Sequence, residues 1–239
     1  MQEPILIINY KNYAEIQGER CLALARQIED VARELCLENN IAIAPPTPAL
    51  ALVSACVDKI TVIAQHVDDA NEGNTTGYVT AEMLRSFNIR GSLVNHSEHR
   101  LDFNTIKSIL NRLRSLNMLS IVCANTPEEV KTLALLNPDY IAIEPPELIG
   151  TGNAVSKSKP EVIVKAVEAL NATVSSNNNY SINTRVICGA GIVDASDVTT
   201  AFKLGSKGVL VASGVVKAKD WRTKIYELAN ALINTDDIK

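Results

Sequence analysis

One carboxylate stands where a buried strand is expected to end, and its surroundings are unusual. Glu144 follows the apolar run from Tyr140 to Ile143, and two prolines stop that run at once. Pro145-Pro146 forms a rigid corner because proline fixes its own backbone and lacks a donor, whereas Gly150 and Gly152 permit unusual dihedrals. Loops of this kind close over ligands and exclude water. A carboxylate beneath such a lid is partly desolvated, which makes it a stronger base.

A lysine and an asparagine end the first apolar run. Lys11 stands two residues beyond Asn9. A lysine is most often a solvated surface residue, but the end of a buried strand is a place where an ammonium would attract an anionic substrate and stabilise a developing oxyanion. Asn9 could orient the substrate or the lysine. We therefore expect both residues to face a ligand.

His96 follows the fourth apolar run and precedes a plausible helix start at Ser97-Glu98. Helix N–H groups disfavour a cationic imidazole, so a neutral His96 would donate one N–H to a substrate oxygen. The other two histidines are weaker candidates. His66 could pack at the rim of the site, and His99 falls inside the turn that begins at His96.

Two turns rich in small residues follow the last two apolar runs. They are Gly189-Ala-Gly191 and Ala212-Ser213-Gly214, and each leads towards helical sequence. Backbone N–H groups exposed in such turns bind phosphate, helped by the positive end of a helix dipole. The pair therefore predicts a phosphate site.

Eight short apolar runs rich in β-branched residues must position these groups. They are nearly continuous in hydrophobicity rather than alternating, which is typical of parallel strands buried on both faces. We predict strands at Ile5–Asn9, Ile41–Ala44, Thr61–Ala64, Ser92–Asn95, Leu119–Cys123, Tyr140–Ile143, Arg185–Cys188 and Gly208–Val211.

Amphipathic stretches lie between the runs. We predict helices at Glu19–Glu38, Phe103–Leu116, Pro127–Leu136, Asp194–Leu204 and Asp220–Ile233, with a further helix beginning near Lys159-Pro-Glu161. Eight strand-plus-helix units in 239 residues indicate a single (β/α)8 barrel domain over residues 1–239, with an outer ring of helices. A doubly wound open sheet is the alternative, but it usually has fewer strands, and no GxGxxG follows the first run. In a barrel, all the groups above share one face.

Composition limits the possible partners and location. Apolar residues make up 46% of the chain, the net charge is −4, and no basic stripe occurs, which argues against nucleic acid. No secretion signal is visible, and no apolar run approaches the ~20 residues that a membrane span needs. The five cysteines are odd in number and lack a CxxC pair, so we expect buried reduced thiols in a cytoplasmic protein.

These motifs resemble the triosephosphate isomerase family. Asn9-Tyr-Lys11, Asn95-His-Ser-Glu98, the segment from Glu144 to Gly152 and the two small-residue turns match it in order, over essentially the full chain. Asn-His-Ser-Glu, Glu-Pro-Pro-Glu and Cys-Gly-Ala-Gly-Ile look like its archaeal branch. The resemblance implies interconversion of dihydroxyacetone phosphate and D-glyceraldehyde 3-phosphate without a cofactor or metal, in a homo-oligomer that is a tetramer or a dimer.

The resemblance also implies roles for individual residues. Glu144 would take the proton next to the carbonyl and return it to the neighbouring carbon. Neutral His96 would polarise that carbonyl and shuttle protons between the enediolate oxygens, and Lys11 would hold substrate and stabilise charge. Asn9 would hold substrate, and Glu98 would stand beside the lysine and the histidine. The lid would be the segment 145–155, and phosphate would contact Ile149, Gly152, Gly189, Gly191, Ala212 and Ser213.

Two departures and two alternatives remain open. Bacterial and eukaryotic members carry a serine-bearing turn after strand seven and Gly-Gly after strand eight, so the phosphate cup here is expected to differ in geometry. The first alternative is another phosphate-binding barrel enzyme, such as a ketose phosphate epimerase or an amino-acid-pathway isomerase, but these lack a base on strand six followed by this lid. The second is a barrel without catalysis that serves as an assembly module, which the joint presence of Lys11, His96 and Glu144 opposes.

Overall fold

A computed structural model describes residues 1–145, 159–176 and 181–233 of the chain. Its strands form one parallel sheet in the order β3-β2-β1-β8-β7-β6-β5-β4. They are β1 (Ile5–Asn9), β2 (Ile41–Ala44), β3 (Thr61–Val62), β4 (Gly91–Val94), β5 (Leu119–Ala124), β6 (Tyr140–Ile143), β7 (Arg185–Cys188) and β8 (Gly208–Val211). All eight predicted strands are confirmed, although β3 is shorter than expected.

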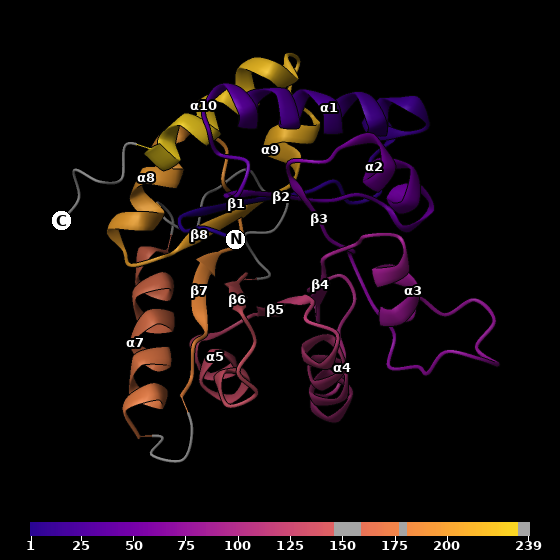
Figure 1. Ribbon diagram of the computed structural model, residues 1–239. Coiled ribbons are helices and arrows are strands. Elements are labelled where there is room, and N and C mark those ends of the chain that lie inside the picture. Colours follow the sequence, from indigo (N-terminus) through magenta and orange to yellow (C-terminus); the bar gives the residue numbers. More distant parts are fainter. Residues whose placement is uncertain (146–158, 177–180, 234–239) are drawn as a thin grey trace.

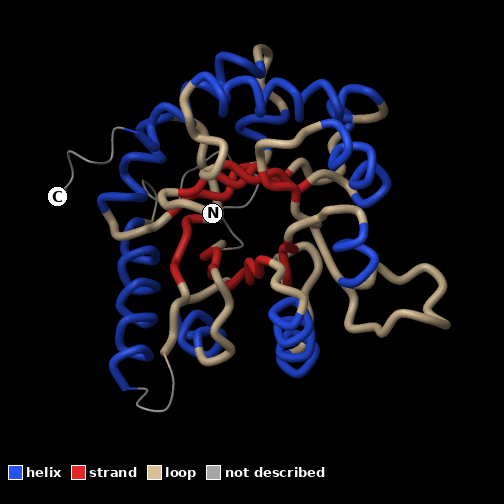
Figure 2. Tube along the Cα trace, viewed as in Figure 1, coloured by secondary structure: helices blue, strands red, loops and turns tan. Residues whose placement is uncertain are grey.

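The two ends of the sheet, β3 and β4, meet just beyond the short strand β3. Ala64 pairs with Ser92 in an isolated parallel bridge. The Ala64 N–H donates to the Gly91 carbonyl at 2.8 Å, and the Leu93 N–H donates to the Ala64 carbonyl at 2.9 Å. These bonds close the sheet into a ring of strands inside a ring of helices (Figures 1 and 2). The (β/α)8 barrel is therefore confirmed, and the open doubly wound sheet is excluded.

The outer layer consists of helices that follow the strands. The longer ones are α1 (Glu19–Glu34), α4 (Phe103–Ser115), α5 (Pro127–Ala134), α7 (Pro160–Ser176), α8 (Ala195–Lys203) and α10 (Trp221–Ile233), and the shorter ones are η1 (Ala14–Ile16), η2 (Thr47–Ala49), α2 (Leu50–Cys56), α3 (Ala81–Ser86) and α9 (Ser213–Val216). The sequence analysis missed the shorter ones because they span too few residues to display a helical period. Over the described ranges, the helices are too short or too polar to cross a bilayer.

Helix α1 ends before the predicted Glu38 because the chain turns sharply there. Cys36 adopts a left-handed conformation with φ of 57°, and the Leu37 N–H donates to the Ala32 carbonyl at 2.8 Å. This pattern is a Schellman motif, which glycine usually forms. Cysteine in that position gives no sequence signal, and the motif leaves its thiol exposed, contrary to the expectation that the cysteines are buried.

Alternation along the strands divides the apolar side chains into two clusters. The larger cluster packs between the strands and the helices. The smaller cluster fills the barrel and includes Ile5 and Ile7 of β1, Ile63 after β3, Tyr140 and Ala142 of β6, Ile187 of β7 and Leu210 of β8. Because strand side chains alternate with a period of two, the next inward position on each of these strands lies at the mouth of the barrel. Those positions are Asn9, Gln65, Glu144, Gly189 and Ala212.

Candidate active site

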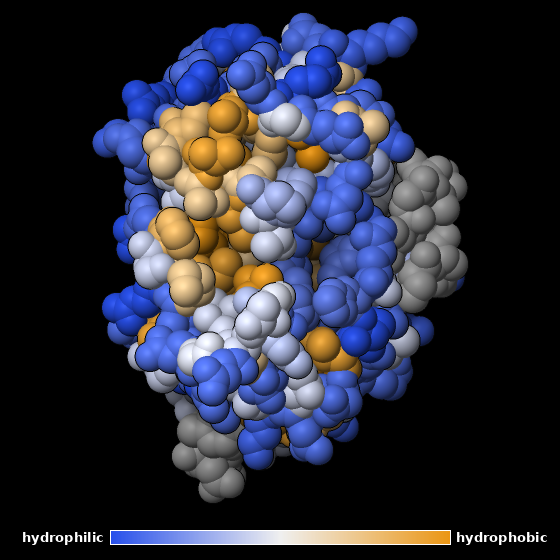
Figure 3. All heavy atoms as spheres, turned by 90° about the vertical axis from the view of Figure 1, so that its right-hand side faces the viewer, coloured by the Kyte–Doolittle hydropathy of each residue, from blue (hydrophilic) through white to orange (hydrophobic). Residues whose placement is uncertain are grey.

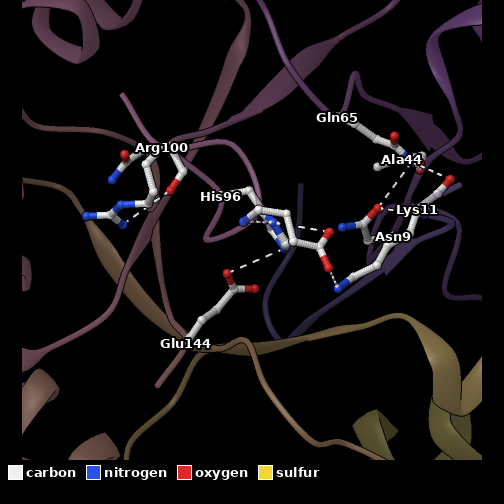
Figure 4. Close-up of polar contacts among 9 residues, drawn as sticks. Asn9, Lys11, Ala44, Gln65, His96, Arg100 and Glu144 are labelled. Atoms are coloured by element: carbon white, nitrogen blue, oxygen red, sulfur yellow. Dashed lines mark hydrogen bonds and ion pairs between the residues drawn. The ribbon is translucent and has the colours of Figure 1, made fainter. Parts of the chain in front are cut away.

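The three side chains predicted to carry the chemistry meet at the carboxyl ends of the strands. Lys11 lies just beyond β1, His96 just beyond β4 and Glu144 just beyond β6. They line one pocket together with Asn9, and the side chains of His96 and Glu144 point towards each other (Figure 4). The barrel thereby brings together residues that are up to 133 positions apart in the sequence.

Glu144 is almost completely buried, with 2% of its surface exposed. Burial raises the pKa of this carboxyl to about 8, although the Cys123 thiol and the Lys11 ammonium both act to lower it. Its Oε2 atom has no hydrogen-bond partner. On the other side, a Cβ at position 189 would lie 2.4 Å from Glu144 Cγ, so only glycine fits there. The site therefore holds a carboxyl group with one unpartnered oxygen, and its raised pKa makes the ionised form a stronger base than an ordinary carboxylate.

The tautomer of His96 follows from its hydrogen bond. The backbone N–H of Glu98 donates to His96 Nδ1 at 3.2 Å, so Nδ1 carries no proton and Nε2 is the donor. Nε2 lies 3.6 Å from Glu144 Oε2. Burial, and secondly the Lys11 charge, lower the pKa of His96 to about 4, while Glu98 acts to raise it. The imidazole is therefore neutral near pH 7 and directs an N–H into the pocket.

A left-handed residue turns His96 into the site. By simple alternation after Leu93, His96 would face the helices. Asn95 has φ of 62°, and its side chain donates to the Cys123 carbonyl at 2.9 Å and accepts from the Leu101 N–H at 3.0 Å. These two bonds stabilise the unusual backbone conformation that redirects the following residue.

Lys11 is held by a network of polar contacts and has a left-handed backbone, with φ of 49°. Its N–H donates to Asn9 Oδ1 at 3.0 Å, and its Nζ donates to Glu98 Oε1 at 2.6 Å. The amide of Gln65 donates to the Lys11 carbonyl at 3.1 Å and to the Ala44 carbonyl at 3.0 Å (Figure 4). The ammonium is therefore fixed at the edge of the pocket by Glu98, which lies in the loop after β4.

The small-residue turns after β7 and β8 also line the pocket. Gly189, Gly191, Ala212 and Ser213 are all among its lining residues. Gly191 has φ of 74°, which favours glycine. A Cβ at position 214 would approach the Ile192 carbonyl to 2.6 Å, so the turn after β8 packs tightly on the turn after β7.

Two of the predicted phosphate contacts cannot be placed. Ile149 and Gly152, together with the segment 146–158 that contains them, lie outside the described residues.

Three further residues of the site, Gln65, Cys123 and Tyr13, are absent from the sequence-based prediction. Tyr13 lines the pocket, and the other two contact Lys11 and Glu144. The alternation of side chains along a strand indicates two of them. Gln65 follows the inward Ile63 by two positions, and Cys123 faces inward on β5. Tyr13 lies in the loop after β1, where this alternation no longer applies.

The arrangement has a clear chemical capacity. A base of raised pKa, a neutral N–H donor and an ammonium surround one small space, which suits removal of a proton next to a carbonyl and stabilisation of the resulting oxyanion. Within the described part of the chain, no cluster of three or more His, Cys, Asp or Glu side chains is placed to bind a metal ion.

Comparison with known proteins agrees with this geometry. The sequence profile of the triosephosphate isomerase family matches residues 4–231. The triosephosphate isomerase of Cenarchaeum symbiosum is 46% identical over 231 residues, which is 97% of this chain and 99% of that protein. The enzymes named triosephosphate isomerase from Methanothermus fervidus and Pyrobaculum calidifontis are 44% and 46% identical, over 95% and 98% of this chain and 98% of each relative. The chain therefore belongs to the triosephosphate isomerase family.

Proposed function

We propose that Glu144, His96 and Lys11 carry out the reaction of this family, the interconversion of dihydroxyacetone phosphate and D-glyceraldehyde 3-phosphate. This reaction is an aldose–ketose isomerisation that serves glycolysis and gluconeogenesis. The observation that most directly supports these roles is the 3.6 Å separation of His96 Nε2 and Glu144 Oε2 in a pocket that also contains Lys11. In such a pair, the base Glu144 can meet a substrate carbon while the donor His96 meets the neighbouring carbonyl oxygen.

The steps begin from the enzyme form in which Glu144 is ionised and His96 is neutral. Ionised Glu144 takes a proton from the hydroxyl-bearing carbon of dihydroxyacetone phosphate, and the C–H electron pair forms the carbon–carbon double bond of an enediolate. The former carbonyl oxygen gains the negative charge and accepts the Nε2 hydrogen bond of His96. His96 gives its Nε2 proton to the former carbonyl oxygen and takes up the hydroxyl proton from the oxygen on the other carbon. Glu144 then returns its proton to the former carbonyl carbon as the new C=O bond forms at the other carbon. Lys11 balances the charge that develops, and no electrons are gained or lost overall.

The phosphate of the substrate would occupy the side of the pocket formed by the turns after β7 and β8. We assign it to the backbone of Gly189, Gly191, Ala212 and Ser213, which line that side. By resemblance, the phosphate would also contact Ile149 and Gly152 in the lid. An enediolate phosphate readily loses phosphate in water, so a lid that excludes water would protect the intermediate.

An activity assay tests the proposal. Purified protein should convert D-glyceraldehyde 3-phosphate in a coupled assay, and a hydroxamate mimic of the enediolate should inhibit at least about 100-fold below the KM, since transition-state analogues bind more tightly than substrates. Folded protein without this activity would favour an assembly module. Activity on a ketose phosphate epimer pair instead would favour the first alternative.

We propose further that the chain forms a homo-oligomer through the side that carries α2 and α3. There the shorter helices expose Leu52, Met83 and Phe87, and apolar side chains gather on this face (Figure 3). The loop between β3 and α3 projects from the same side (Figure 1). An apolar pocket lined by residues of η1, α1 and α2 includes Ile16, Leu22 and Leu52. A projection and a hollow on one face suit a two-fold pair of identical chains.

Mass measurement decides this point. Sedimentation equilibrium should give a dimer or a tetramer, and Leu52→Asp should shift the mass towards one chain. A parent protein that sediments as a single chain at micromolar concentration would rule out the association.

The relatives support two finer assignments. We infer the archaeal type, because the compared enzymes from C. symbiosum, M. fervidus and P. calidifontis match nearly the whole chain. We infer a cytoplasmic location from the class of reaction and from the cysteines, which form no disulfide among the described residues. Recovery of the protein in a membrane or secreted fraction after cell fractionation would contradict the location.

A further inference from the structure

Two histidines outside the catalytic set stack on each other at the rim of the site. The rings of His66 and His99 have centroids 3.9 Å apart and an interplanar angle of 15°. His66 is anchored, because its Nε2 lies 3.1 Å from Asp68 Oδ1 and the other oxygen of Asp68 accepts the Val79 N–H at 2.7 Å. His99 is exposed, and the stack on His66 restrains its ring.

His99 belongs to the turn that supplies the catalytic imidazole. The His99 N–H donates to the His96 carbonyl at 2.8 Å and closes that turn. Between them stands Glu98, whose carboxylate lies 2.6 Å from Lys11 Nζ and 3.7 Å from His96 Nδ1. Any displacement of the turn therefore moves His96 and the partner of Lys11 together.

We propose that His99 is a positioning residue: its stack on His66 holds the turn from His96 to His99 in the geometry that pairs Glu98 with Lys11 and directs His96 at Glu144. The inference rests on the catalytic roles proposed above. It further implies that the support weakens in acid, because two protonated imidazoles at this separation repel each other.

The charges around the pair define when this happens. Asp68, on the loop after β3, favours a proton on His66. His96 and Glu98 lie within the turn, and Lys11 contacts it through Glu98. Burial, which is the largest influence, and the neighbouring His99 lower the pKa of His66, although Asp68 opposes this. A single proton leaves the stack intact, so the rings separate only when the second proton binds, below the ordinary histidine pKa of about 6.5.

Substitution of His99 separates stacking from charge. His99→Ala removes the ring and should lower kcat at pH 7.5 about tenfold, since small misplacements of catalytic groups are costly. His99→Phe keeps a flat ring and should recover kcat to within about threefold of the parent protein. Equal activity of the alanine variant and the parent, with both folded, would overturn the inference.

The pH profile provides a test that a purely structural role would not affect. In the parent protein, the plot of log kcat against pH should steepen beyond one proton below pH 6, because loss of the stack adds to protonation of Glu144. His99→Phe should keep the one-proton slope. Superimposable profiles of the two proteins would exclude the acid-sensitive support.

The contact between the two rings can also be tested without an activity assay, through the pKa of His66. By NMR, the pKa of His66 should be higher in His99→Phe than in the parent, because the neighbouring imidazole no longer opposes its protonation. Unchanged titration of His66 would show that the rings do not meet in solution, whatever the catalytic roles. Changed titration with unaffected kcat in all variants would leave the proposed function standing and refute the positioning role.

Discussion

Glu144→Gln is expected to lower kcat by at least about a thousandfold while the barrel stays folded. The amide has the same shape as the carboxyl group but cannot accept a proton from carbon, and a positioned base contributes roughly 10² to 10⁴ in rate. Because Glu144 Oε2 makes no hydrogen bond, the substitution removes no bond from that atom. Steady-state assays combined with thermal unfolding measure both effects.

Two further variants sharpen the result. Glu144→Asp keeps the charge but withdraws it by about 1 Å, which should cost roughly a hundredfold in kcat. Glu29→Gln is the matched control, because Glu29 is also buried, at 7% exposed, but accepts the backbone N–H groups of Asp58 and Lys59 far from the pocket. We expect this control to lose stability and to keep kcat within twofold. Equal turnover in Glu144→Gln and the parent would disprove the assignment of the base.

The same substitution should change how stability depends on pH. The carboxyl of Glu144 has a pKa of about 8 in the folded chain and an ordinary value of 4.5, so the folded state holds its proton more tightly. This contribution is fully present below pH 4.5 and is lost as pH rises through 8, and it amounts to on the order of 5 kcal/mol. Glu144→Gln lacks this loss, so its Tm at pH 9 should exceed that of the parent by several degrees. Parallel Tm profiles from pH 5 to pH 9 would contradict the raised pKa.

Much of this site can be predicted from the sequence, because side chains along a strand alternate between its two faces. Asn9 and Glu144 continue the inward positions of β1 and β6, so the apolar runs alone indicate that both side chains face the mouth of the barrel. The main helices are equally visible, since α4 and α8 carry Asp102 and Asp194 as N-caps that accept backbone N–H groups.

The remainder depends on backbone conformations that no local pattern encodes. Lys11 and Asn95 both have positive φ without being glycine. Lys11 is stabilised by Gln65, 54 positions away, and Asn95 by Cys123, 28 positions away. Only the closed barrel brings these partners together. The direction of His96 and the short helices around the site therefore could not be derived before the strands were placed in space.

Lys11→Met is expected to lower kcat/KM by about a thousandfold or more. Among the described residues that line the pocket, Lys11 is the only cation, and the chain as a whole carries a net charge of −4. A phosphorylated substrate is therefore repelled by the protein at large and attracted at this one point. Removal of a preorganised charge at a developing oxyanion costs roughly 10² to 10³ in rate, and weaker binding adds to this. Salt should consequently lower kcat/KM in the parent protein more steeply than in the variant.

Comparison with two other variants separates charge from architecture. Glu98→Gln breaks the ion pair of Lys11 but leaves the ammonium in place, so we expect a loss of only about tenfold. Lys59→Met deletes a lysine that is half exposed and pairs with Asp58 at 3.3 Å on the surface, and it should leave kcat/KM within twofold. If Glu98→Gln costs as much as Lys11→Met, the lysine acts through the shape of the turn it holds. If only Lys11→Met loses most of its kcat/KM together with the salt dependence, the ammonium itself attracts the substrate and stabilises the enediolate.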